Sequence, residues 1–181
     1  MKYTTNSLFC RDFLLKVNPR NSFEIPKLSC VSINLTNRYI VAEKKHSLFA
    51  IIGLALLSGQ QPKVLRAKKS VAAFKLKENS ILGCQLTLRK AKMEYFLEAI
   101  TFLVFPQLKR TGIFSERALS SSSSLQLGFT EFLAFPELEK NFELFETLQG
   151  CSLQLHTNAK TVFEKNLLLS SFNLPVYSKK F

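Results

Sequence analysis

Tryptophan, aspartate and histidine are scarce in this chain, and their scarcity excludes several kinds of chemistry. The 181 residues include no Trp, 2 His and a single Asp, Asp12. The chain therefore has too few Asp and His side chains to build a metal centre or an acid–base site from a cluster of them. The 6 glycines are isolated from one another, which excludes the glycine-rich loops that cradle phosphate groups.

The remaining candidates for catalysis are weak. His46 stands at the start of an apolar segment, and His156 lies near a predicted strand end with no Asp nearby. Each is more typical of a surface or hydrogen-bonded histidine than of a general base. The serines of 120–124 lack the turn of a nucleophilic serine, and the glutamates of 131–146 are more typical of a solvated face than of a metal site. The sequence predicts no enzyme and no cofactor.

Cysteine and long apolar runs are also limited. Cys10, Cys30, Cys84 and Cys151 are widely separated, so no zinc or redox spacing is present. We expect buried or idle thiols. The longest uncharged apolar stretch covers about residues 47–58. Because a membrane span needs about 20 apolar residues, this stretch predicts a buried helix.

Positive charge is abundant, and it is unevenly distributed. The net charge is +12. Residues 1–92 hold 17 Lys and Arg against 4 acidic residues, whereas residues 93–181 hold 8 against 9. This asymmetry predicts that the first half of the chain meets a polyanion, for which nucleic acid or an anionic membrane surface would each serve.

Apolar periodicity and turn residues predict alternating strands and helices. Strands are expected at 27–35, within 63–77, at 81–89, at 125–135 with a kink at Gly128, and at 151–156. Helices are expected at 42–58 before Gly59 and Pro62, at 90–105 stopped by Pro106, and at 161–172.

This order of elements predicts an α+β fold, in which helices pack on one face of a mainly antiparallel sheet. We expect a single domain over residues 1–181, with an N-terminal segment at 1–20 and a mobile loop at 110–124.

Two surfaces are candidates for binding. Residues 63–77 carry six cations and no acid, with Phe74 placed to stack on a base or pack inward. A solvated sheet edge explains the run equally well, but the charge asymmetry favours nucleic acid. One sheet face is also expected to present Lys27, Asn34, Thr87 and Arg89. Such a face is normal for a half-covered sheet and also suits RNA, so the pattern alone leaves both interpretations open.

Several segments of the chain, in order, resemble one protein family. They span almost the whole chain: NSFEIPKLSCVSINL (21–35), SGQQP (58–62), AKKSVAAFKLKENSILGCQLTLR (67–89), FPELE (135–139), GCSLQLHTNAKT (150–161) and LLLSSFNLPV (167–176). The chain resembles the ribosomal protein L5 family, the large-subunit proteins that hold 5S rRNA in the central protuberance.

The resemblance implies a structural RNA-binding role. Asn34, Gln60 and Thr87 correspond to the family's contacts with 5S rRNA, and the basic loop 66–77, with 70–74 near its tip, corresponds to the loop that reaches P-site tRNA. The implied partners also include large-subunit rRNA, other central-protuberance proteins and, through residues 137–146, a basic protein of the small-subunit head, but no membrane. The expected RNA-binding residues are Asn34, Gln60, Thr87, Lys27, Lys63, Arg66, Lys68, Lys69, Ser70, Phe74, Lys75, Lys77 and Arg89.

The chain departs from the family at positions where the family has glycine. Ala73 stands at the tip of the basic loop, and Lys90 follows Leu88 and Arg89. Because residues other than glycine rarely adopt positive φ, we expect these turns to take other shapes.

Composition and one segment indicate a compartment. The combination of 17 Phe, 6 Gly and no Trp is typical of an AT-rich genome, and FPELEKNFELFETLQG (135–150) resembles the mitochondrial members of the family in plants and algae. We therefore expect the protein to belong to the mitochondrial ribosome in the matrix, with the plastid as the less favoured alternative.

The alternative functions are a basic peripheral membrane protein or a general RNA-binding protein of an organelle.

Overall fold

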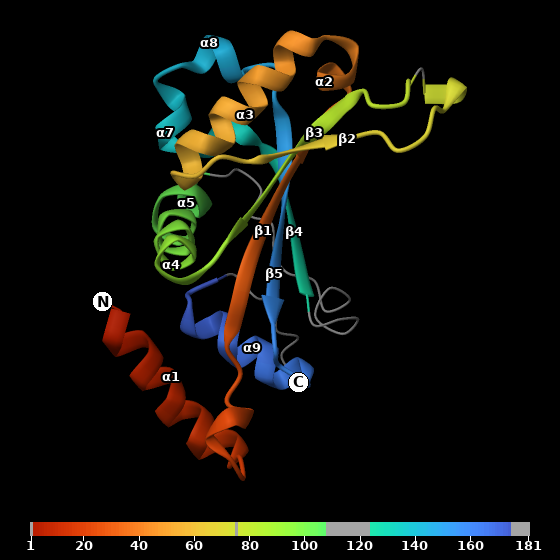
Figure 1. The fold of residues 1–181 in the computed structure, drawn as a ribbon. Coiled ribbons are helices and arrows are strands. Elements are labelled where there is room, and N and C mark those ends of the chain that lie inside the picture. The colour runs from red at the N-terminus through yellow and green to blue at the C-terminus, as the bar shows by residue number, and fades with distance from the viewer. Residues whose placement is uncertain (1, 75, 108–123, 175–181) are drawn as a thin grey trace.

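A computed structural model describes residues 2–74, 76–107 and 124–174 (Figure 1). The strands are β1 (Leu28–Thr36), β2 (Lys63–Arg66), β3 (Ile81–Leu88), β4 (Ser124–Glu131) and β5 (Gln149–Thr157). The helices are α1 (Lys2–Val17), α2 (Arg38–Ala42), α3 (Lys44–Ser58), α4 (Lys90–Ala99), α5 (Phe105–Gln107), α7 (Pro136–Glu139), α8 (Phe142–Phe145) and α9 (Val162–Ser171). Shorter helical turns are η1 (Ser22–Glu24), η2 (Ala72–Phe74), η3 (Ile100–Val104) and η4 (Phe132–Ala134).

The five strands form one sheet in the order β2-β3-β1-β5-β4. Every neighbouring pair is antiparallel. Helices α3, α4, α5, α7 and α8 lie to one side of the strands, on the left in Figure 1. This arrangement confirms the predicted α+β fold with an antiparallel sheet.

Side-chain alternation gives the sheet one apolar face. On β1, Val31, Ile33 and Leu35 are at most 1% exposed, and residues two apart along a strand share a face. Together with the apolar residues of β3, β5 and β4 they form a continuous core with α3, α4 and α8. Full burial of one such side chain contributes about 1.5–3 kcal/mol relative to exposure.

Helix α3 is buried on one side only, so the prediction of a buried helix is half right. It ends as predicted at Gly59, whose φ of 60° is a left-handed conformation that glycine adopts without steric penalty. Leu54 is fully buried, whereas Leu48 and Ile52 are 60% and 49% exposed. Within the described part of the chain, no helix has both the length and the apolar character that crossing a bilayer requires.

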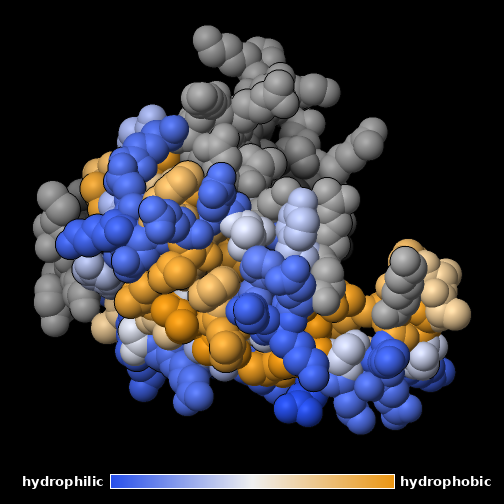
Figure 2. All heavy atoms as spheres, turned by 90° about the horizontal axis from the view of Figure 1, so that it is seen from above, coloured by the Kyte–Doolittle hydropathy of each residue, from blue (hydrophilic) through white to orange (hydrophobic). Residues whose placement is uncertain are grey.

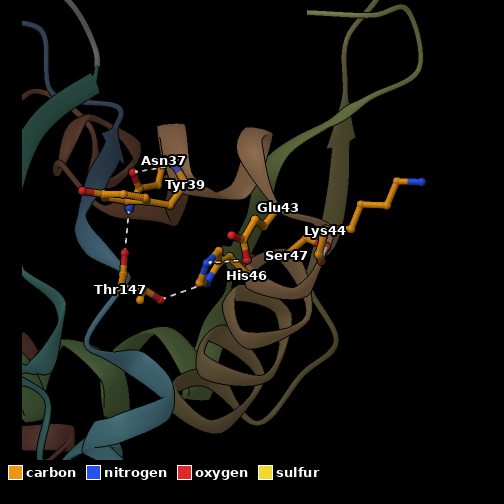
Figure 3. Close-up of polar contacts among 7 residues, drawn as sticks. All are labelled: Asn37, Tyr39, Glu43, Lys44, His46, Ser47 and Thr147. Carbon is orange, nitrogen blue, oxygen red and sulfur yellow. Dashed lines mark hydrogen bonds and ion pairs between the residues drawn. The ribbon is translucent and has the colours of Figure 1, made fainter.

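Helix α2 was not expected from the sequence, and a polar cluster joins its start to Thr147 in the turn before β5 (Figure 3). The Asn37 side chain accepts from the Tyr39 N–H at 3.3 Å and donates to the Thr147 carbonyl at 3.1 Å. The Thr147 hydroxyl and Nδ1 of His46 lie 3.1 Å apart, and Nε2 of His46 lies 3.4 Å from Glu43. His46 is therefore a hydrogen-bonded structural residue, as expected.

The prediction that Pro106 stops the helix at 90–105 is wrong, because helical structure continues through it to Gln107. The residues before it form a π-helical turn, in which the Phe105 N–H donates to the Ile100 carbonyl five positions earlier. Proline lacks an N–H, and in a regular α-helix its ring collides with the carbonyl four positions earlier. The wider π turn accommodates both constraints.

The strand predicted at 125–135 ends four residues early, because Phe132–Ala134 form a 3-10 turn. Phe132 and Phe135 are at most 2% exposed, so burial among the helices produces the apolar pattern that suggested a strand. The pairing of β4 with β5 keeps its register through Gly128. Ser124, predicted as loop, begins β4, and the rest of the predicted mobile loop at 110–124 lies outside the described residues.

The expectation that Lys90 avoids the glycine conformation is wrong. Its φ is 54°, so a lysine occupies the left-handed region at the junction of β3 and α4. This conformation brings the Cβ close to the backbone carbonyl and costs a residue with a side chain roughly 1–2 kcal/mol. Ala73, by contrast, lies in the short turn η2 without a positive φ.

The N-terminal segment packs on the last helix rather than on the sheet. Phe9 and Phe13 of α1 are buried against Leu168 of α9 in a small second cluster.

A capping box starts α9, because the Thr161 side chain accepts from the Glu164 N–H and the Glu164 side chain accepts from the Thr161 N–H.

Candidate nucleic-acid interface

The sheet face opposite the apolar core is lined by polar side chains, here called the polar face. Lys63, Gln85, Asn34 and Ser152 are register partners in one row across β2, β3, β1 and β5. The next row contains Thr87, Ser32, Gln154 and Gln126. Because neighbouring strands lie about 4.8 Å apart, these residues form a regular array of hydrogen-bonding groups.

Hydrogen bonds within the polar face order part of this array. The Ser32 hydroxyl lies 3.2 Å from Nε2 of His156, so this histidine is also partnered, as expected. The Ser152 hydroxyl donates to the Asn34 carbonyl at 3.4 Å. The side-chain oxygen of Asn34 is buried and has no partner. Such an acceptor is destabilising until a donor reaches it.

Of the three residues that correspond to the family's 5S rRNA contacts, Asn34 and Thr87 lie on the polar face and Gln60 lies beside β3. The Gln60 side-chain amide donates to the Thr87 carbonyl at 3.0 Å. Gln60 directly follows the C-terminal cap of α3, and its own N–H donates to the Ser58 hydroxyl at 3.3 Å, which fixes the turn. Asn34 is paired with Gln85, two residues from Thr87 on β3. The structure thus brings Gln60 to Thr87 and places Asn34 on the adjoining strand.

Lys27 and Arg89 lie at the other end of the polar face from the β2–β3 loop. The Lys27 N–H donates to the Asn158 side chain, and the Asn158 N–H donates to the Lys27 carbonyl at 3.3 Å. Arg89 is extended, with φ −141° and ψ 157°, so it continues the alternation of Gln85 and Thr87. Both cationic side chains are exposed.

The described residues of 66–77, which exclude residue 75, form an arm that projects from the sheet, here called the finger, at the right in Figure 1. Its base is closed by bonds of Ala67 with Ser80 and Asn79, and its outer part by a bridge between Val71 and Leu76. The finger is therefore a continuation of the β2–β3 hairpin with its own backbone bonds, which position its side chains away from the core.

The surface of the finger is cationic with an apolar tip. Phe74 is 74% exposed, so of its two predicted roles, inward packing does not occur. Figure 2 shows the finger at the right, with hydrophobic atoms gathered on one side and hydrophilic atoms on the other. Exposed predicted residues of this region are Lys63, Arg66, Lys68, Lys69, Ser70 and Lys77, and Lys75 lies outside the described residues.

Sequence reasoning missed the contribution of β4 and β5 to the polar face. Gln154 and His156 alternate with buried Leu153 and Leu155 along β5. This period of two was the available signal. The residues could not be assigned to the face of Asn34 without knowing that β5 pairs with β1 and not with another strand.

All four cysteines are free thiols, of which Cys84 and Cys151 are buried, as predicted, and Cys10 and Cys30 are partly exposed. Burial raises the pKa of the Cys151 thiol to about 12 and also raises the pKa of the Cys84 thiol. Both therefore stay protonated and unreactive at neutral pH. In the described ranges, no group of three or more His, Cys, Asp or Glu side chains is placed to hold a metal ion.

An antiparallel sheet with a polar face opposite its core, continued by a cationic finger, makes this an α+β protein with a surface that suits RNA. Comparison with protein-family models identifies the family. Residues 21–77 match the family described as Ribosomal protein L5, and residues 81–176 match the model for the C-terminus of the same ribosomal family. The two matches cover most of the chain, which belongs to the ribosomal protein L5 family.

Membership of this family defines the general role of the protein. It is a structural component of the large ribosomal subunit that binds 5S rRNA, and it is not an enzyme.

Proposed function

We propose that the polar face is the surface that binds 5S rRNA, with Asn34, Gln60 and Thr87 as its specific contacts. The observation that carries this proposal is the contact between Gln60 and Thr87, which ties the turn after α3 to β3. The Gln60 side chain is therefore held in place before RNA binds, so its contact with RNA requires little further ordering.

Asn34 supplies the feature that favours RNA at this position. Its buried side-chain oxygen has no hydrogen-bond donor in the free protein. A ribose 2′-hydroxyl or a base amino group is a donor of the right kind. An RNA that brings this donor removes the penalty of the unpaired acceptor once the Asn34 side chain turns outward to meet it.

Cations border the proposed RNA surface and would neutralise phosphates. Lys63 lies at the β2 edge in the same row as Asn34, and Lys27 and Arg89 lie at the far end. Each phosphate contact releases counterions, so log affinity should fall by roughly 0.9 or less per contact for each log unit of salt.

The finger is proposed to reach P-site tRNA. Its exposed lysines suit a phosphate backbone, and the exposed Phe74 ring suits a stacked base. The neighbouring Lys68 and Lys69 allow two phosphate contacts from one turn of the chain.

The acidic segment 137–146 is proposed to face a basic protein of the small-subunit head. Glu137, Glu139, Glu143 and Glu146 are all exposed on α7, α8 and their flanks. A surface of one sign steers a partner of the opposite sign and sets the register of contact. Large-subunit rRNA and other central-protuberance proteins complete the proposed neighbours.

The proposed compartment is the mitochondrion, in preference to the plastid. The support is the phenylalanine-rich, glycine-poor composition and the resemblance of residues 135–150 to mitochondrial members of the family. Peptide mapping of purified mitochondrial and plastid ribosomes tests this proposal, and peptides of this chain found only in plastid ribosomes would contradict it.

The site proposal is tested by a triple substitution of Asn34, Gln60 and Thr87 to Ala. Each lost hydrogen bond should weaken 5S rRNA binding by about 1–3 kcal/mol if its partner stays buried in the complex. Binding of transcribed 5S rRNA is measured by filter retention over a range of salt concentrations, and thermal unfolding shows whether the fold is retained.

A matched control carries the same residue types on the helical side of the molecule: Asn141→Ala, Gln107→Ala and Thr101→Ala. Asn141 and Gln107 are exposed, and the Thr101 hydroxyl donates to the Glu98 carbonyl of its own helical segment. This variant should bind 5S rRNA like the parent. Parent-like binding by the Asn34, Gln60 and Thr87 variant would refute the assignment of the site.

A further inference from the structure

The outer face of α3 carries an apolar ridge that no described part of the chain covers. Leu48, Ile52 and Leu56 are spaced four residues apart and are 60%, 49% and 49% exposed. Residues at this spacing lie one above the other on a helix. Helices that are apolar on all sides are normally buried on all sides, and at 15 residues α3 is too short to cross a membrane.

Both ends of this ridge are positively charged. Lys44 and Lys45 are exposed in the first turn of α3, and the one acidic residue beside them, the N-cap Glu43, lies 3.4 Å from Nε2 of His46. At the other end the exposed Lys92 donates from its ammonium to the Gly59 carbonyl at 2.8 Å. The positive end of the helix dipole adds to the two lysines of the first turn.

We propose that this ridge is the docking surface for a helix of another protein, apolar on its contacting side and acidic at both ends. Apolar side chains on successive turns of one helix can pack against the apolar side chains of a second helix. Acidic residues over Lys44, Lys45 and Lys92 complete the charge complementarity. The acidic segment on α7 and α8 borders α3 along its side, so the partner's acids should lie over the ends of α3 and not over α8.

Charge and shape disfavour the other occupants. Two copies of this chain would place lysines against lysines, whether the two α3 helices pair in parallel or antiparallel. A lipid surface is disfavoured because one row of three half-exposed side chains is too narrow to insert as an interfacial helix. RNA is disfavoured because the ridge offers no polar or aromatic group to bases.

The inference goes beyond the proposed RNA interface and does not depend on it. The ridge belongs to the helical side of the sheet, whereas Asn34 and Thr87 lie on the polar face. A variant of the ridge should therefore keep the affinity for 5S rRNA.

The direct experiment places a photoreactive benzoylphenylalanine at Ile52 in the protein within purified ribosomes. The expected product is a crosslink to another protein, at a segment with apolar residues four apart and acidic residues at its ends, identified by mass spectrometry. The same group at Phe163, which is 54% exposed on α9, is the control and should not give this product. A crosslink from position 52 to RNA, to a second copy of this chain or to lipid overturns the proposal, as does the absence of a crosslink.

A solution experiment separates the apolar and charged parts of the contact. The probe is a synthetic helical peptide with three leucines spaced four apart and glutamates at both ends, and the control peptide has lysines at both ends. The glutamate peptide should bind the full-length protein about ten-fold more tightly than the lysine peptide. Ile52→Glu should weaken its binding about ten-fold, whereas Phe163→Glu should leave it unchanged. Equal binding of the two peptides overturns the charge complementarity, and an unchanged affinity for Ile52→Glu overturns the site.

Discussion

The two faces of the sheet are made by the same strands and have opposite chemistry. On β1, Ile33 is 1% exposed within the main core, while its neighbours Ser32 and Asn34 turn to the polar face. The first face is held by packing with helices. The second is ordered by hydrogen bonds such as that between Ser32 and His156. One alternating pattern therefore supplies both the stability of the fold and a rigid polar surface.

The comparison indicates which surface should give specificity for RNA and which should give affinity without specificity. Beside the polar face, the Thr87 backbone carbonyl holds the Gln60 side chain, and on the face the Ser32 hydroxyl lies 3.2 Å from His156, so this surface offers fixed hydrogen-bonding positions. The finger offers exposed charge at the end of a hairpin, which binds phosphates with little dependence on sequence. Substitutions on the two faces and on the finger should therefore change different measured quantities.

The largest expected effect comes from the apolar face. Ile33→Ala should lower the free energy of unfolding by about 2–5 kcal/mol, because it leaves a cavity in a packed core. Gln154→Ala, on the polar face of the neighbouring strand, should change it by less than about 0.5 kcal/mol. Urea titration of both variants measures the difference. Equal losses would show that the two faces do not have separate roles.

The fold and part of the site could be predicted because their signals are local. Period-two alternation located the strands, and Gly59 with Pro62 located the end of α3. The continuation through Pro106 was missed because a π turn is a tertiary adjustment that no short pattern records. The contribution of Gln154 was missed because it depends on which strand lies beside β1. The positive φ of Lys90 was missed because residue type argues against it.

A smaller effect is expected from the finger. Lys68→Gln combined with Lys69→Gln should reduce the slope of log affinity for transcribed tRNA against log salt by about 1–2, since two phosphate contacts are lost. Affinity for 5S rRNA should change by less than about two-fold. Filter binding over a salt series measures both. If the 5S affinity falls as far as the tRNA affinity, the finger and the polar face bind as one surface and the distinction between them is lost.

The smallest effect, on the free energy of unfolding, is expected at Lys90. Lys90 joins β3 to α4 with φ of 54°, so Lys90→Gly removes a steric penalty while adding conformational entropy to the unfolded chain. The free energy of unfolding should rise by about 0.5–1 kcal/mol. Ala91→Gly, at the next residue of α4, should instead lower it by about 1 kcal/mol, since its backbone is helical without positive φ. Thermal unfolding of the two variants distinguishes these opposite signs, and a loss of stability in both would mean that the left-handed junction at Lys90 stores no strain.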